Sequence, residues 1–133
     1  MGSLDVLLGF SPHSERFPEF IREVTDVEGV RIFRLQGPVG KEIGEQFSAA
    51  EDAAGPTSHL KSLLIDFQGT TSADFTTVAF LVKLVRNRLS SGARVGIIHA
   101  PPALLAEIRI AKIDNILLVF DSEEEAIDVL SKV

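Results

Sequence analysis

Apolar residues along this chain form short runs that alternate with stripes at helical spacing. Runs rich in β-branched and aromatic residues predict strands at 19–24, 30–35, 63–67, 94–99 and 116–120. Apolar residues three or four positions apart predict helices over 41–54, 78–89 and 104–111, and a last helix that Ser122 opens. The order β-β-α-β-α-β-α-β-α predicts an α/β fold whose largely parallel or mixed sheet packs against helices.

Two strands carry further information. The run Leu63–Phe67 is almost continuously apolar, which is typical of a strand buried on both faces, and we expect it to be central. In the run 30–35, Arg31 and Arg34 break strict alternation, so a bulge or burial on both faces is expected there. Gly37-Pro38 is predicted to close that strand, and the polar stretch 68–73 is predicted to be a loop.

Length and composition indicate one domain. The 133 residues, 45% of them hydrophobic, suffice for a single core, which we assign to residues 19–133, with 1–18 as an N-terminal arm or an expression remnant. The longest apolar runs fall far short of the roughly 20 residues that cross a bilayer, so the chain is expected to be soluble and without a membrane span. The absence of cysteine and of a signal-peptide pattern fits the cytoplasm.

Several function classes lack their usual signals. A net charge of −6 disfavours nucleic acid as a partner. His13, His59 and His99 lack metal-ligand spacing, and His99, although it ends a strand, is interpreted as structural. Dinucleotide, P-loop and nucleophile-elbow motifs are missing, and the acidic run 123–125 is interpreted as complementing a helix dipole. We therefore predict no metal, no cofactor and no enzymatic activity.

One stretch of the sequence is a candidate functional site. In it, the predicted buried strand at 63–67 is followed by a polar segment and then by a helix. Asp74 is a candidate N-cap, because its carboxylate can accept a hydrogen bond from the amide of Thr76 or Thr77. Such a helix start also favours a phosphate on a nearby hydroxyl, although Asp74 would repel it. The alternative is an ordinary strand–loop–helix junction without a binding role.

This stretch resembles the signature of the STAS family, which is found in anti-sigma factor antagonists and in the cytoplasmic tails of sulfate transporters. Asp66, Gly69 and Asp74 match the family pattern of an apolar strand ending in Asp or Asn, a short small-residue loop, and an aspartate opening a helix. The segment 30–37 looks like the second strand of the family, and the likeness extends over roughly residues 19–130. The resemblance implies a STAS-like mixed sheet of about four to five strands with about four helices.

The resemblance also implies a site. In the family a partner kinase phosphorylates the serine directly after the aspartate, and Phe75 stands at that position here. Thr76 replaces the second serine and Thr77 the glycine, so Thr76 is the remaining candidate for phosphorylation. The expected partner-binding residues are Gly69, Asp74, Phe75, Thr76 and Thr77, among which an exposed Phe75 would add apolar contact area.

Three functions stay open. The first is a non-enzymatic module of the anti-sigma factor antagonist or stressosome type, whose partner is an anti-sigma factor with serine-kinase activity or another STAS protein. The second is the cytoplasmic STAS domain of a sulfate-transporter-like anion permease, which Phe17-Pro18-Glu19 and the segment 29–38 resemble. The third, ranked last, is a small-ligand or lipid-binding domain with an apolar pocket near His99. A homodimer is a further option.

Overall fold

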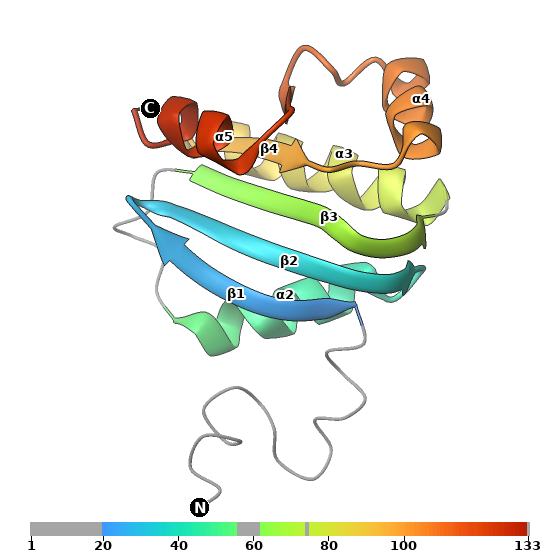
Figure 1. The fold of residues 1–133 in the computed structure, drawn as a ribbon, viewed down its shortest axis with the longest axis horizontal. Coiled ribbons are helices and arrows are strands. Elements are labelled where there is room, and N and C mark those ends of the chain that lie inside the picture. Colours follow the sequence, from blue (N-terminus) through green and yellow to red (C-terminus); the bar gives the residue numbers. More distant parts are fainter. Residues whose placement is uncertain (1–19, 56–61, 74, 133) are drawn as a thin grey trace, which may run out of the picture.

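A computed structural model describes residues 20–55, 62–73 and 75–132. The elements follow one another in the predicted order (Figure 1). They are β1 (Ile21–Val27), β2 (Val30–Val39), α2 (Ile43–Ala54), β3 (Ser62–Ala73), α3 (Phe75–Leu89), β4 (Arg94–Ile98), α4 (Pro102–Ala111), β5 (Leu117–Phe120) and α5 (Glu123–Leu130). None of the helices in these ranges has the length and apolar character that a membrane crossing requires.

The five strands form one mixed sheet in the order β1-β2-β3-β4-β5. β1 pairs with β2 antiparallel, whereas the pairs β2–β3, β3–β4 and β4–β5 are all parallel. The prediction that the apolar run at 63–67 forms the central strand is confirmed, because β3 has two neighbours on either side. The carboxyl ends of the parallel strands, and therefore the start of α3, lie at one edge of the sheet (Figure 1).

The two faces of the sheet carry cores of different size. The larger core joins the sheet to α2, α3 and α4, and its most buried members include Phe33, Ile65 and Leu81. The smaller core lies under α5 alone. It consists of Val30, Ile32, Leu64, Ile98, Ala126, Ile127 and Leu130. The alternation of core residues along β3, with Leu64 on one face and Ile65 on the other, explains why that strand reads as an unbroken apolar run.

The predicted ends of β2 and β3 are wrong. β2 does not close at Gly37-Pro38 but continues to Val39, and the predicted loop 68–73 is the second half of β3. The two segments pair with each other, with Gly37 opposite Thr70 and Val39 opposite Ala73. The register shifts between Arg34 and Gln36 and again between Gly37 and Pro38, and the second shift accommodates a residue that has no amide hydrogen to donate.

Arg31 shows why alternation fails in β2. Its side chain is only 2% exposed and donates to both carboxylate oxygens of Asp26, at 2.8 and 3.0 Å. It also donates to the carbonyls of Ala54 and Gly55, at 3.3 and 3.0 Å, where α2 ends. The hydrogen bond to Asp26 raises the pKa of Arg31 against the opposing effect of burial. The predicted burial on both faces is thus confirmed, and Arg31 satisfies carbonyls at a helix end that would otherwise be unpaired.

Helix α5 begins as the sequence indicates. Ser122 is its N-cap, with the side-chain oxygen accepting a hydrogen bond from the amide of Glu125 at 3.1 Å. The carboxylate of Glu125 in turn accepts from the amide of Asp121 at 3.3 Å. The three glutamates 123–125 occupy the first turn, where negative charge is favoured. The interpretation of this acidic run as a helix start is therefore confirmed.

Candidate partner-binding site at the start of helix α3

The predicted site residues divide into three groups in the structure. Phe75 is the first residue of α3 and is 71% exposed, the condition under which it was expected to contact a partner. Thr76 follows, half-buried and engaged in an interaction of its own. Asp74, the candidate N-cap, lies outside the described residues, as do His13 and His59. Phe75 is therefore the most exposed of the predicted site residues that carry a large apolar side chain, and its contact role stays a prediction.

Thr77 is another of the predicted contact residues, and its role in partner binding stays a prediction. Its side chain is 0% exposed, so it does not form part of the surface that Phe75 presents. Thr77 comes two residues after Phe75, so its side chain is rotated by about 200° from that of Phe75 around the helix axis and faces the sheet. Its hydroxyl oxygen has no hydrogen-bond partner among the described residues. The helix period of 3.6 residues, applied to three consecutive positions, is the signal that could have separated Thr77 from Phe75.

Gly69 has a structural reason to be a glycine. A Cβ added at this position would lie 2.7 Å from the carbonyl oxygen of Leu35 on β2, which is closer than such atoms approach. Gly69 also lies on β3 four residues before Ala73, a separation of about 13 Å along a strand. The structure thus places Gly69 in the β2–β3 pairing, and its role in partner binding stays a prediction.

An ionic network that the sequence did not indicate lies on the α5 face of the sheet, and Arg34, Asp66, His99 and Glu123 form it. Arg34 donates to Oδ2 of Asp66 at 2.9 Å and to both oxygens of Glu123 at 2.7 and 3.2 Å. The other oxygen of Asp66 accepts from the amide of Gln68 at 2.8 Å and lies 2.9 Å from Nδ1 of His99. Both oxygens of this carboxylate, which is 2% exposed, are therefore engaged.

The charges of this ionic network support one another. The hydrogen bonds to Glu123, and then those to Asp66, raise the pKa of Arg34 despite its partial burial. Burial on its own would raise the pKa of Asp66, but hydrogen bonds from His99, the Gln68 amide and Arg34 together lower it. The hydrogen bond from Arg34 likewise lowers the pKa of Glu123. The hydrogen bonds of the ionic network thus favour the ionised form of both carboxylates.

The placement of His99 agrees with its interpretation as a structural residue. It follows β4 with a backbone φ of 57°, a left-handed conformation that non-glycine residues rarely adopt, and its ring contacts Asp66. The ligand-binding alternative required an apolar pocket near this side chain. One groove that described residues line lies between α2 and α3, and His99 is not among its lining residues. Within the described ranges, His, Asp and Glu side chains form no group of three that could hold a metal ion.

The family described as "Mlab, STAS domain" matches residues 25–119 of the chain. This match begins within β1 and ends within β5, so it covers β2, β3 and β4 in full, the ends of the two edge strands that adjoin them in sequence, and α2, α3 and α4. No curated protein sequence matches the chain.

Solved structures with the same fold include anti-sigma factor antagonists and an anion transporter. The unphosphorylated anti-sigma factor antagonist SpoIIAA has 18% identity and a TM-score of 0.64, with 84% of this chain and 98% of that chain covered. An anti-sigma factor antagonist from Mycobacterium paratuberculosis has 18% identity and a TM-score of 0.69, with 85% and 96% covered. The murine Solute Carrier 26 family member A9 anion transporter, inward-facing, has 18% identity and a TM-score of 0.65, with 82% of this chain but only 19% of that chain covered.

At these identities the solved structures establish the fold, and they agree with the five-stranded mixed sheet and its helices. The family match, which covers most of the chain, establishes the relationship. The chain belongs to the STAS domain family.

Proposed function

We propose that this STAS domain is a non-enzymatic regulatory module that binds a partner protein through the exposed surface at the start of α3. The observation that carries the proposal is Phe75, a large apolar side chain that is 71% exposed on the first residue of that helix. Exposed aromatic residues of this kind are frequent anchors of protein interfaces. The ionic network on the opposite face, with its carboxylates engaged, offers no comparable apolar anchor.

The partner class we propose is an anti-sigma factor with serine-kinase activity or another STAS protein, in the cytoplasm. The likeness to SpoIIAA, a structure of which is described as phosphorylated, supports a partner of this class. Position 75 carries a phenylalanine, which has no hydroxyl to modify. Thr76 is the nearest alternative but is rotated by about 100° around the helix, so a kinase directed to position 75 would meet it in poor alignment. Binding without a phosphorylation switch is the mode that this surface favours.

A second candidate is the cytoplasmic STAS domain of an anion permease. It is favoured by the fold likeness to a segment amounting to 19% of the murine anion transporter. In that setting the partner of the α3 surface would be another part of the same transporter. Both candidates use the same exposed Phe75, and they differ in the protein that covers it.

A photo-crosslinking experiment tests the α3 surface in the native cell. A photoreactive phenylalanine analogue replaces Phe75 in one protein and Ile110, which is 74% exposed on α4, in a control. We expect a discrete protein adduct from position 75 and none from position 110. In an extract of these cells, excess unlabelled parent protein should compete for the adduct, and excess Phe75→Ser protein should compete at least about tenfold less well, as an interface anchor predicts.

The identity of the crosslinked protein separates the two candidates. An adduct with a separate regulatory protein supports the antagonist type, whereas an adduct with a membrane transporter supports the permease type. Equal crosslinking from positions 75 and 110, or equal competition by parent and Phe75→Ser proteins, would contradict a binding site at the start of α3.

A further inference from the structure

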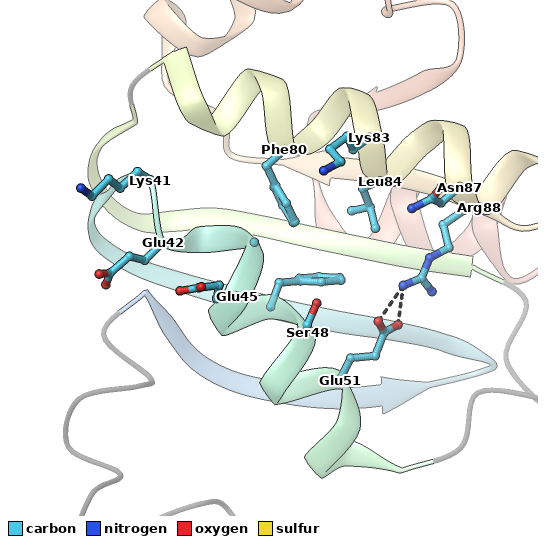
Figure 2. A pocket seen from close by; sticks show the side chains of 12 residues that line it. Lys41, Glu42, Glu45, Ser48, Glu51, Phe80, Lys83, Leu84, Asn87 and Arg88 are labelled. Atoms are coloured by element: carbon cyan, nitrogen blue, oxygen red, sulfur yellow. Dashed lines mark hydrogen bonds and ion pairs between the residues drawn. The ribbon is translucent and has the colours of Figure 1, made fainter.

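A groove with a volume of about 980 Å³ lies between α2 and α3, on the face of the sheet opposite α5. Figure 2 shows the two helices as its walls, with Phe80 pointing from α3 into the space between them. The ring of Phe80 lies 5.1 Å, centroid to centroid, from that of the buried Phe47, and Leu84 also lines the groove. The groove thus has an apolar floor, of which Phe80 is partly exposed.

The two walls carry opposite charges. Apart from Lys41 at one end, the charged residues of the α2 wall are Glu42, Glu45 and Glu51, whereas the α3 wall carries Lys83 and Arg88. Arg88 and Glu51 already pair across the groove, with one Arg88 nitrogen 2.7 Å from both carboxylate oxygens (Figure 2). Glu45 and Lys83 are exposed, and neither has a hydrogen-bond or ion-pair partner among the described residues.

One ion pair and one close approach show how α2 and α3 are aligned along the groove. Arg88 lies level with Glu51, and a Cβ on Gly44 would lie 3.9 Å from the ring of Phe80. Each residue of α2 therefore lies level with the residue of α3 whose number is higher by 36 or 37. Glu45 is then level with residue 81 or 82, so it is displaced from Lys83 by only about 1.5 to 3 Å along the helix axis. The unpaired acid and the unpaired base lie at nearly the same height on facing walls.

We infer that this groove is the interface of a homodimer in which two copies meet face to face about a two-fold axis parallel to the groove. Such an axis places the acidic α2 wall of each copy over the basic α3 wall of the other, so that one patch is complementary to itself. Glu45 of each copy then faces Lys83 of its mate, twice per dimer. Phe80 of each copy enters the space between the walls, and the small residues Gly44 and Ser48 allow close approach.

The choice of a second copy rests on this charge arrangement. The chain carries a net charge of −6, so two copies repel each other at long range. Attraction between them needs a surface on which opposite charges alternate, and the groove supplies one. Because the pairs are exposed, the dimer should weaken as salt rises from about 0.05 to about 0.5 M.

Charge reversal tests the inferred dimer on the full chain by sedimentation equilibrium at concentrations up to about 0.3 mM, a range suited to weak interfaces. The parent should approach twice the 14.4 kDa monomer mass at the upper end. Glu45→Lys and Lys83→Glu should each weaken self-association at least about tenfold, because each substitution creates two like-charge contacts in a two-fold dimer. Mixed in equal amounts, the two variants should form a heterodimer, because each repulsive contact becomes attractive.

Matched controls carry the same charge changes on α5 and just after it. Glu124→Lys and Lys132→Glu lie across the sheet from the groove and should leave self-association unchanged. Thermal unfolding of all four variants checks that each remains folded. A parent that stays monomeric over the whole concentration range overturns the inference. So does a dimer that Glu45→Lys and Lys83→Glu weaken no more than the controls do, or a mixture of the two that fails to associate.

Discussion

On one face of the sheet three helices cover a broad apolar core, whereas on the other α5 alone covers a small one that ends at the ionic network. The broad face leaves the outer sides of α2 and α3 exposed, with Phe75 and the groove between the helices. The narrow face carries the ion pairs that join Arg34 to Asp66 and Glu123, so we expect its stability to depend on their ionisation. The difference supports the proposal that the α3 side binds a partner, and it leads us to expect that the α5 side responds most to charge and pH.

The largest effect is expected from truncating leucines in the two cores. Leu81 and Leu130 are both 0% exposed, in the broad and the narrow core respectively. Leu81→Ala should lower the free energy of unfolding by about 4 kcal/mol and Leu130→Ala by about 2.5, because the narrow core is small and the single short helix that covers it can shift to fill part of the cavity. Urea titration measures both values. A larger loss for Leu130→Ala would contradict the ranking of the cores.

A smaller loss is expected from Asp66→Asn, which keeps the shape of the side chain and removes its charge. We expect a loss of about 2 kcal/mol, below the full cost of breaking a buried pair, because Arg34 is 17% exposed and keeps Glu123 as its partner. Lys132→Gln, which removes an exposed ion pair with Asp128, is the control and should cost less than about 0.5 kcal/mol. Equal losses for the two variants would show that the ionic network does not stabilise the narrow face.

The same variant should change the response to acid. Asp66 and Glu123 have pKa values in the folded state below their ordinary 3.8 and 4.5. The unfolded state therefore binds more protons as the pH falls, and their stabilisation, complete at neutral pH, is lost below about pH 4.5 and through the lowered pKa values. Urea midpoints measured between about pH 7 and pH 2 should fall more steeply for the parent than for Asp66→Asn. Parallel curves would contradict the assigned shifts.

Replacing a glycine by alanine should have opposite effects on stability on the two faces of the sheet. A Cβ on Gly96 would lie 2.8 Å from the ring of Phe120 and 3.2 Å from Leu130 in the narrow core, so Gly96→Ala should cost about 1 to 2 kcal/mol. Gly44, in α2 beside the groove, has room for a Cβ, so Gly44→Ala should stabilise the fold by about 0.5 kcal/mol through helix propensity. Thermal unfolding distinguishes the two. A destabilised Gly44→Ala would show that the groove is less open than described.

The smallest effect on stability is expected at the proposed binding site. Phe75→Ser removes a side chain that is mostly solvated, so the free energy of unfolding should change by less than about 0.5 kcal/mol. Differential scanning calorimetry is sensitive enough to check this. A loss above about 1 kcal/mol would mean that Phe75 packs within the domain rather than serving a partner.

The sequence predicted the element order and the central strand because those features follow from local periodicity. It failed where distant segments decide the outcome. Gln68–Ala73 lacks a strand pattern of its own and becomes strand only by pairing with the end of β2. The ionic network was missed for the same reason, since Arg34 is separated by 32 residues from Asp66 and by 89 from Glu123. The signal in the sequence that could have indicated the ionic network is the presence of two charged residues, Arg34 and Asp66, within apolar strands.

The central claim is that α3 begins with a binding surface that has no serine switch. Intact-mass spectrometry after incubation with a serine kinase directed to STAS domains tests it on the parent, Phe75→Ser and Thr76→Ala proteins. We predict no phosphate on the parent or on Thr76→Ala, and one phosphate on Phe75→Ser, which also shows that the kinase recognises this domain. Stoichiometric phosphorylation of the parent that Thr76→Ala abolishes would contradict the claim, because the switch would then have moved by one residue.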